Sequence, residues 1–374
     1  MAKYRLGDIA PVKQGIVPDS DQYWLLNLDA VESNTGNVLE YVYVDYSQIG
    51  ASTVSFNQQN VLYSKLRPYL NKVVLPDRAG YATSEMLPLM PDGKVITREY
   101  LTFFLRSPHF VEYINGKTSG AKMPRANTAA LKAVEIECPP INEQTRIVSK
   151  INSILTIIAY RKNELLRLDE LIKARFVELM EKSDLGGETT IESITKRVKV
   201  GFVGTCEKYY TDESGIPMLR TGNITEKGID LSDLKYVTAE FHNKNQKSQI
   251  HAGDLLIARH GSNGQANVYF GPDAQCLNAV VIVPNQKIAS SLFLAGLINS
   301  PAVKRQIERT LVGSTQNVVN TKSIAGLSVR IPDMDVQKEY ESFVMQVDKS
   351  KVAVQKALDE TQTLFDSLMQ EHFG

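Results

Sequence analysis

The 374-residue sequence lacks the features of several protein classes. It has only three cysteines, Cys138, Cys206 and Cys276, without a C-x-x-C pair, so we expect neither a zinc ribbon nor a disulfide framework. No apolar run approaches the roughly 20 residues of a membrane span, and the first residues lack the apolar stretch of a secretory signal. We therefore expect a cytoplasmic protein that does not contact a membrane.

Sequence motifs for catalysis and cofactor binding are also missing. The Gly-Lys-Thr at residues 116–118 has Val111 where a phosphate-binding loop needs glycine, and no Gly-x-Gly-x-x-Gly follows a predicted strand. The only Pro-Pro pair, at residues 139–140, lacks the neighbours of an amino-methyltransferase motif. The five histidines show no metal-binding spacing. We expect no catalytic residue, metal or cofactor in this chain.

One long segment of the sequence occurs twice. Six residues reappear 193 positions later with the same identity: Ser107, Pro108, Ile114, Gly120, Asn127 and Thr128 return as Ser300, Pro301, Ile307, Gly313, Asn320 and Thr321. The match extends to predicted strand-turn-strand segments over 23–41 and 216–234, and to predicted helices before each Ser-Pro. The repeat predicts an α+β fold with two pseudo-symmetric domains, over residues 1–140 and 187–333.

After each copy the apolar period changes to 3.5 residues. This predicts long helices over residues 141–183 and 334–374, with one apolar seam on each. The helices carry net charges of +2 and −4, so we expect them to pair. If they pair antiparallel, a domain lies at each end of the pair. The second seam is poor in large residues, which favours an additional partner on these helices. The apolar seam residues are Ile147, Ile151, Ile154, Ile158, Leu165, Leu168, Ile172 and Leu179 on the first helix, and Phe343, Val347, Val354, Leu364 and Leu368 on the second.

The net charge of zero conceals two basic segments. Residues 60–132 hold 11 basic and 5 acidic side chains, and residues 244–330 hold 9 and 3, whereas the segment before each block is acidic overall. Because salt screens charges beyond about 10 Å, such a block can attract nucleic acid although the whole chain is neutral.

Polar loops in the two copies offer the side chains that recognise DNA. Arginine suits guanine, asparagine and glutamine suit adenine, and lysine or serine suits phosphate. A solvated turn is an equally good interpretation for any single one of these residues. The predicted DNA contacts are Lys65, Arg67, Tyr69, Asn71, Lys72, Lys122 and Arg125 in the first copy, and Arg220, Arg259, His260, Ser262, Asn263, Gln265, Thr315, Gln316 and Asn317 in the second.

With these features the chain resembles the specificity (S) subunits of type I restriction-modification enzymes. The resemblance rests on the order domain, long helix, domain, long helix, and on "NVLYSKLRPYLNK", "GDLLIARHGS", "VGSTQNVVNTKSIAGLSVRIP" and "INEQTRIVSKI". It implies a non-catalytic subunit in which each domain reads one half of a split, asymmetric site in double-stranded DNA. It also implies that the two long helices pair as an antiparallel coiled coil, on which two methyltransferase subunits dock. Restriction subunits are then expected to join through the methyltransferase subunits. S-adenosylmethionine, ATP and magnesium are then expected on those partner subunits.

Two other functions stay open from the sequence. A free-standing sequence-specific or architectural DNA-binding protein explains the basic blocks but not the long helices. An enzyme with an unrecognised site would need an acid–base pair that no motif supplies. The DNA sequence read, the spacing of its halves, and whether the complex restricts DNA or only methylates it do not follow from the residues.

Overall fold

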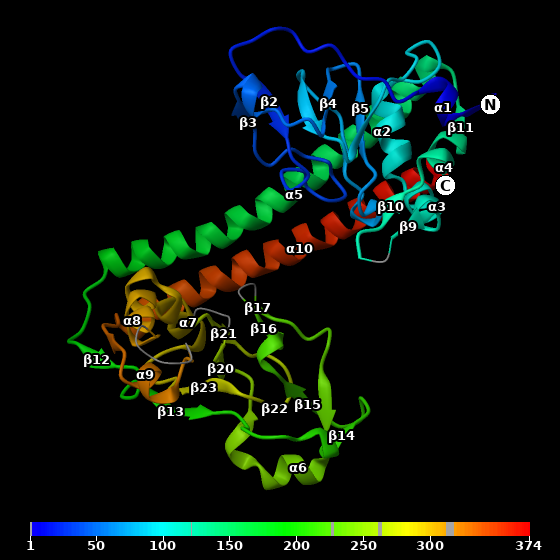
Figure 1. Cartoon of the computed structure of the whole chain (residues 1–374). Coiled ribbons are helices and arrows are strands. Elements are labelled where there is room, and N and C mark those ends of the chain that lie inside the picture. Colours follow the sequence, from blue (N-terminus) through cyan, green and yellow to red (C-terminus); the bar gives the residue numbers. More distant parts are fainter. Residues whose placement is uncertain (1, 121, 226–227, 261–263, 312–317) are drawn as a thin grey trace. The chain divides into compact units, whose positions relative to one another are not determined.

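The computed structural model describes residues 2–120, 122–225, 228–260, 264–311 and 318–374 (Figure 1). They form two compact units. Unit 1 combines Met1–Lys162 with Lys356–Gly374, and unit 2 comprises Asn163–Gln355. Each unit therefore holds one copy of the repeat together with a part of each long helix.

Unit 1 is built from small sheets and short helices. A four-stranded sheet has the order β3-β2-β7-β4, in which β2 and β7 are parallel, and a three-stranded sheet has the order β6-β5-β8. Two further antiparallel pairs are β1-β11 and β9-β10. Apart from the long helices, the elements are β1 (Ala2–Arg5), α1 (Leu6–Ile9), β2 (Tyr23–Leu26), β3 (Val42–Val44), η1 (Tyr46–Gln48), β4 (Thr53–Phe56), β5 (Val61–Ser64), η2 (Pro68–Leu70), β6 (Val73–Val74), β7 (Gly80–Thr83), β8 (Met86–Leu89), α2 (Arg98–Arg106), α3 (Pro108–Asn115), β9 (Thr118–Ser119), β10 (Arg125–Ala126), α4 (Thr128–Ala133) and β11 (Glu135–Cys138).

Unit 2 repeats this plan. A five-stranded sheet has the order β14-β18-β15-β22-β19, with β15 and β22 parallel, and a four-stranded sheet has the order β13-β23-β20-β21. The elements used below are β12 (Thr189–Thr190), β13 (Thr195–Val200), β14 (Tyr210–Thr211), β15 (Ile216–Leu219), β18 (Lys235–Val237), α6 (Ala239–Lys244), η5 (Gln246–Ser248), β19 (Gln249–Ile250), β20 (Leu255–Ala258), β21 (Ala266–Val268), β22 (Ala274–Cys276), β23 (Ala279–Pro284), α7 (Ser291–Asn299), α8 (Pro301–Leu311), α9 (Thr321–Ala325) and β24 (Ser328–Val329).

Equivalent positions in the two copies make the same contacts with different side chains. Arg106 ends α2 and donates from Nη2 to the carbonyl of Val73, the first residue of β6, at 2.5 Å. Asn299 ends α7 and donates from Nδ2 to the carbonyl of Ala266, the first residue of β21, at 2.8 Å. The predicted twofold repeat of an α+β domain is confirmed.

Helices α5 (Ile141–Lys182) and α10 (Met334–Phe373) pack against each other within both units. In unit 1 the beginning of α5, with Ile147 and Ile151, shares a core with Met369 and Phe373 at the end of α10. In unit 2 the end of α5, with Phe176 and Leu179, shares a core with the beginning of α10. The predicted antiparallel pairing of the two helices is therefore confirmed.

Most of the predicted seam residues are buried or half-buried, but near the C-terminal end of α10 the inward-facing position differs by one residue from the prediction. Ile147, Ile151, Ile154, Ile158, Leu179 and Val347 are buried, and Leu165, Leu168, Ile172, Phe343, Val354 and Leu368 are half-buried. Leu364, however, is 52% exposed, so it does not pack in the seam between the two helices, and its role in binding a partner stays a prediction. Its neighbour Phe365 packs against the unit 1 core instead, because a straight α-helix drifts by about 20° per heptad relative to a strict 3.5-residue repeat.

A buried glutamine fixes the beginning of each long helix to its own domain. Gln144 accepts a hydrogen bond from the backbone N–H of Thr97 and donates to the carbonyls of Val95 and Pro139, at 2.7–2.9 Å. Gln337 makes the same three bonds with Ser290, Ile288 and Pro332, at 3.0 Å each. Both side chains are almost fully buried. In each copy one side-chain amide therefore connects the start of the long helix to the loop before α2 or α7 and to the chain just ahead of the helix.

Replacing Gln144 with methionine should destabilise unit 1 by about 2–4 kcal/mol, because the buried backbone groups of residues 95 and 97 lose their partner. Hydrogen exchange should show lower protection in residues 1–140 and little change in residues 187–333. Gln337→Met should instead lower the protection in residues 187–333 and leave residues 1–140 almost unchanged. Gln346→Met, at an exposed position of α10, is the matched control and should leave both units unchanged. Equal loss of protection in both domains for Gln144→Met would contradict the local role of this amide.

Candidate nucleic-acid interface

In unit 1 two separate loops meet to gather the predicted cationic side chains. The turn after β5 lies against the β9–β10 hairpin through three backbone contacts. Ala126 donates to the Lys65 carbonyl at 2.8 Å, Arg67 donates to the Pro124 carbonyl at 2.7 Å, and Leu66 forms a β-bridge with Arg125. Lys65, Arg67 and Arg125 are thereby brought together by backbone hydrogen bonds, and Lys122 projects from the same hairpin.

The outer part of this loop pair is exposed. Arg67 and Lys122 are exposed and Tyr69 is 52% exposed. Arg67 has the left-handed backbone conformation, with φ of 48°, which aligns the turn for η2. Gly120 has φ of +96° within the hairpin, a conformation that side-chain-bearing residues rarely adopt, so glycine is required to close this turn. The two loops thus form one exposed cationic and aromatic edge.

Glu85 lies between these cations and was not predicted from the sequence. Arg125 donates from Nε and Nη2 to the Glu85 carboxylate at 2.8–3.2 Å, and Lys65 Nζ lies 3.9 Å from it. The bidentate pair raises the pKa of Arg125. The signal for Glu85 is its position directly before β8, the strand that pairs with β5, so it faces the residue that follows β5.

Two other predicted contacts in unit 1 have internal partners. Asn71 donates from Nδ2 to the Arg106 carbonyl at 3.0 Å, and Lys72 donates from Nζ to the Leu28 carbonyl at 2.6 Å. Both side chains therefore stabilise the turn that presents Arg67 and Tyr69. Any DNA contact by Asn71 or Lys72 stays a prediction.

Not all of the basic block of residues 60–132 faces solvent. Arg98 donates to the carbonyls of Asn60 and Pro76, and burial lowers the pKa of Arg106 to about 10. These two arginines hold α2 against the strands. The cations available to an external ligand are thus fewer than the residue count of the block indicates.

In unit 2 the equivalent turn follows β20. Val319 donates to the Arg259 carbonyl at 3.0 Å, as Ala126 does to Lys65 in unit 1. The Arg259 guanidinium donates from Nη1 to Asn278 Oδ1 at 2.9 Å. His260 is exposed and Gln265 half-buried, while Arg220 is paired with Asp233 at 2.8 Å. Ser262, Asn263, Thr315, Gln316 and Asn317 lie outside the described residues.

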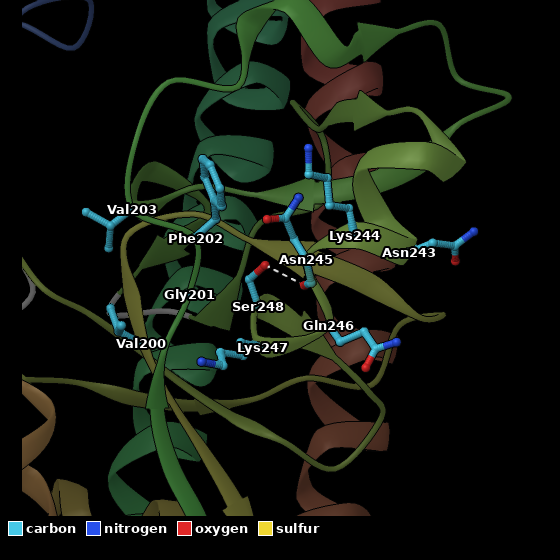
Figure 2. Close-up of a pocket in the computed structure, with 10 residues that line it drawn as sticks. All are labelled: Val200, Gly201, Phe202, Val203, Asn243, Lys244, Asn245, Gln246, Lys247 and Ser248. Carbon is cyan, nitrogen blue, oxygen red and sulfur yellow. Dashed lines mark hydrogen bonds between the residues drawn. The ribbon is translucent and has the colours of Figure 1, made fainter.

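Unit 2 also contains a cavity of about 520 Å³, lined by residues 200–203 and 243–248 (Figure 2). Phe202 stands at its rim and packs edge-to-face on Phe241 of α6, and Ser248 donates to the Asn245 carbonyl. Lys244 and Lys247 are the charged side chains of the lining, which has no carboxylate, histidine or cysteine. The cavity therefore lacks an acid–base pair, and none of its lining residues is among the predicted DNA contacts.

Within the described residues, no group of three or more histidine, cysteine, aspartate or glutamate side chains could hold a metal ion. None of the helices, over the same residues, has the length and hydropathy to cross a membrane.

Comparison with known proteins agrees with this geometry. The family model described as the type I restriction modification DNA specificity domain matches residues 1–169 and 190–361, one match for each copy of the repeat. The chain belongs to this family. The resemblance inferred from the sequence is confirmed, and with it the repeated architecture.

Individual relatives are distant. The chain is 21% identical to the EcoBI specificity subunit of Escherichia coli over 72% of its own length and 64% of the relative's length, slightly under two thirds. It is similar in fold to a chain of a solved structure described as the structural basis of complex assembly and conformational transition of the type I R-M system. That match has a TM-score of 0.63, 15% identity, and coverage of 100% of this chain and 97% of the other. The type I restriction-modification S subunit from M. genitalium gives a TM-score of 0.60, 13% identity, and coverage of 100% and 96%.

Lys122→Ala should weaken DNA binding about equally on all sequences and reduce the slope of log affinity against log salt by about 1, as loss of a phosphate contact does. Lys72→Ala should instead lower the thermal stability of unit 1, because its ammonium group supports the turn. Binding titrations at several salt concentrations and thermal unfolding separate the two effects. Lys94→Ala, an exposed lysine after β8, is the control. A Lys122→Ala protein with an unchanged salt slope would remove this residue from the interface.

Proposed function

We propose that the chain is the sequence-specific DNA recognition subunit of a type I restriction-modification complex. Residues 1–140 and 187–333 are the two recognition modules, and each reads one half of a split site in double-stranded DNA. The observation that carries this proposal is the repetition of one loop arrangement. In both copies the residue after β5 or β20 is a cation, and its carbonyl accepts a backbone hydrogen bond from the residue two positions before α4 or α9. A chain with two such modules suits a target with two halves.

Differences between the modules favour an asymmetric site. The turn after β5 continues with Arg67, Tyr69 and a left-handed Asn71, whereas the turn after β20 continues with His260 and Gln265. Since base readout depends on the side-chain type at each position, the two modules present different chemistry to the two half-sites.

The long helices carry exposed apolar side chains that support docking of the methyltransferase subunits. Ile157 and Tyr160 on α5 are 43% and 73% exposed, and Met345 and Val352, one heptad apart on α10, are 54% and 70% exposed. Large apolar groups on helices that already bury another face are typical of a surface covered by a partner. Restriction subunits join the complex of this chain with the methyltransferase subunits. S-adenosylmethionine, ATP and magnesium bind to these partner subunits and not to this chain. This chain supplies recognition rather than catalysis.

A free-standing DNA-binding protein is the alternative function. It accounts for the cationic loops, but it gives no role to the exposed apolar positions of α5 and α10. Tight, site-specific binding by the isolated chain would favour that alternative.

Inserting seven residues after Leu165 of α5 should lengthen the unread gap between the two half-sites and leave both half-sites unchanged. A heptad insertion keeps the helix face in phase, and a helix of 32 residues spans about 48 Å. Inserting three residues is the comparison, because it rotates the face and should mostly destabilise the pair. Methylation-site mapping with the reconstituted complex measures the gap. A gap that stays the same in the seven-residue variant would show that the helix does not set the spacing.

Tyr160→Asp and Val352→Asp should weaken association with the methyltransferase subunit by about 10-fold or more, since a charge would be placed in an apolar contact. Thermal unfolding of the isolated chain should be unaffected, because both positions are exposed. Ser342→Asp adds the same charge at an exposed polar position of α10 and should have little effect. Wild-type association by both variants would place the docking surface elsewhere on the chain.

A further inference from the structure

The two modules hold a cation and an acceptor at one shared structural position. Lys65 directly follows β5 and Glu85 directly precedes β8, and these strands pair with Ser64 opposite Met86. Arg259 directly follows β20 and Asn278 directly precedes β23, and these strands pair with Ala258 opposite Ala279. The two pairs therefore occupy equivalent places in equivalent sheets, one in each unit.

In the first recognition module (module 1, residues 1–140) the acceptor, Glu85, also binds a second cation, Arg125. Arg125 uses Nε and Nη2 to bind both oxygens of Glu85, and it reaches that carboxylate from the β9–β10 hairpin. Its side chain is 44% exposed, and Nη1 forms no hydrogen bond to the described parts of the chain. The guanidinium is thus held on one edge while its Nη1 and Nη2 end remains available to a ligand.

In the second recognition module (module 2, residues 187–333) the acceptor, Asn278, binds Arg259. This arginine lies in the turn after the strand, whereas Arg125 of module 1 lies in the hairpin. Arg259 donates from Nη1 to Asn278 Oδ1 at 2.9 Å and from Nε to the Val319 carbonyl at 3.4 Å. Among the described residues its Nη2 has no hydrogen-bond acceptor, and the side chain is half-buried. Each module therefore presents one arginine supported by the residue before β8 or β23, although the arginine follows the strand in module 2 and lies in the hairpin in module 1.

We infer that Glu85 and Asn278 are positioning residues, which orient Arg125 and Arg259 so that each reads a guanine in its own half-site. The inference deepens the proposed function and rests on it. Guanine presents O6 and N7 in the major groove, two acceptors that match two parallel N–H groups of one guanidinium. An arginine whose other edge is already bound loses less side-chain freedom on binding, so its contact discriminates bases more strongly.

Glu85 and Asn278 differ in charge and in the number of hydrogen bonds that they accept from the arginine, so substitutions at the two positions should differ in effect. Glu85 is charged and binds Arg125 at two nitrogens, whereas Asn278 is neutral and accepts one bond. Asn278 also has φ of 53°, so its side chain is best removed by glycine, which adopts that conformation without strain.

The experiment uses the full chain in complex with its methyltransferase subunits and a pool of randomised DNA. Glu85→Ala should reduce the preference for guanine over other bases at one position of one half-site by about 10-fold. Glu85→Gln, which keeps an acceptor but loses the charge, should give a smaller reduction. Asn278→Gly should affect one position in the other half-site. The unaffected half-site in each variant serves as the internal control for folding.

Glu112→Ala is the matched control, because it removes an exposed carboxylate from α3 of the same module and should leave base preferences unchanged. Unaltered preferences in Glu85→Ala, or the same loss of preference in Glu112→Ala, would overturn the inference. Failure of the proposed function would be seen differently, as a wild-type complex that selects no two-part sequence.

Discussion

The hydrogen bonds of one buried side-chain amide at the start of each long helix are the constraint on which the rest of each unit depends. Gln144 and Gln337 each connect a helix to the loop before α2 or α7 and to the chain just ahead of the helix. Three bonds in a dry environment fix the rotation of the helix about its axis relative to the strands. The apolar face of the helix and the cationic turns of the domain are thereby set in one defined relation within the unit.

In unit 1 the effect of each charged side chain depends on its immediate partners more than on the net charge of the unit. Arg98 and Arg106 act inside the domain, where they bind carbonyl groups and are partly desolvated. Glu85 reduces the charge of the cationic loops but gives Arg125 a fixed direction. A cluster with fewer free cations and more oriented ones favours selective contacts over general attraction to phosphates.

Sequence periodicity was sufficient to predict the repeat and the long helices, because each depends on many residues at regular spacing. The antiparallel pairing of the helices was implied by the family resemblance. Periodicity failed for the packing of Leu364, where the accumulated drift of a straight helix moves the core face to Phe365. Single polar residues were harder. Gln144 and Gln337 look like solvated helix positions, and Glu85 looks like an interruption of a basic block. Their roles depend on backbone groups that are distant in sequence and that only the fold brings near.

The two copies reach the same geometry with different side chains because the geometry is carried by the backbone. The carbonyls of Lys65 and Arg259 accept equivalent bonds from Ala126 and Val319, and the carbonyls of Val73 and Ala266 accept from Arg106 and Asn299. A backbone acceptor places no demand on its own side chain, so the residue after β5 or β20 can be lysine or arginine while its Cα position stays fixed. A fold held this way can change the chemistry that its loops present without losing the frame that positions them.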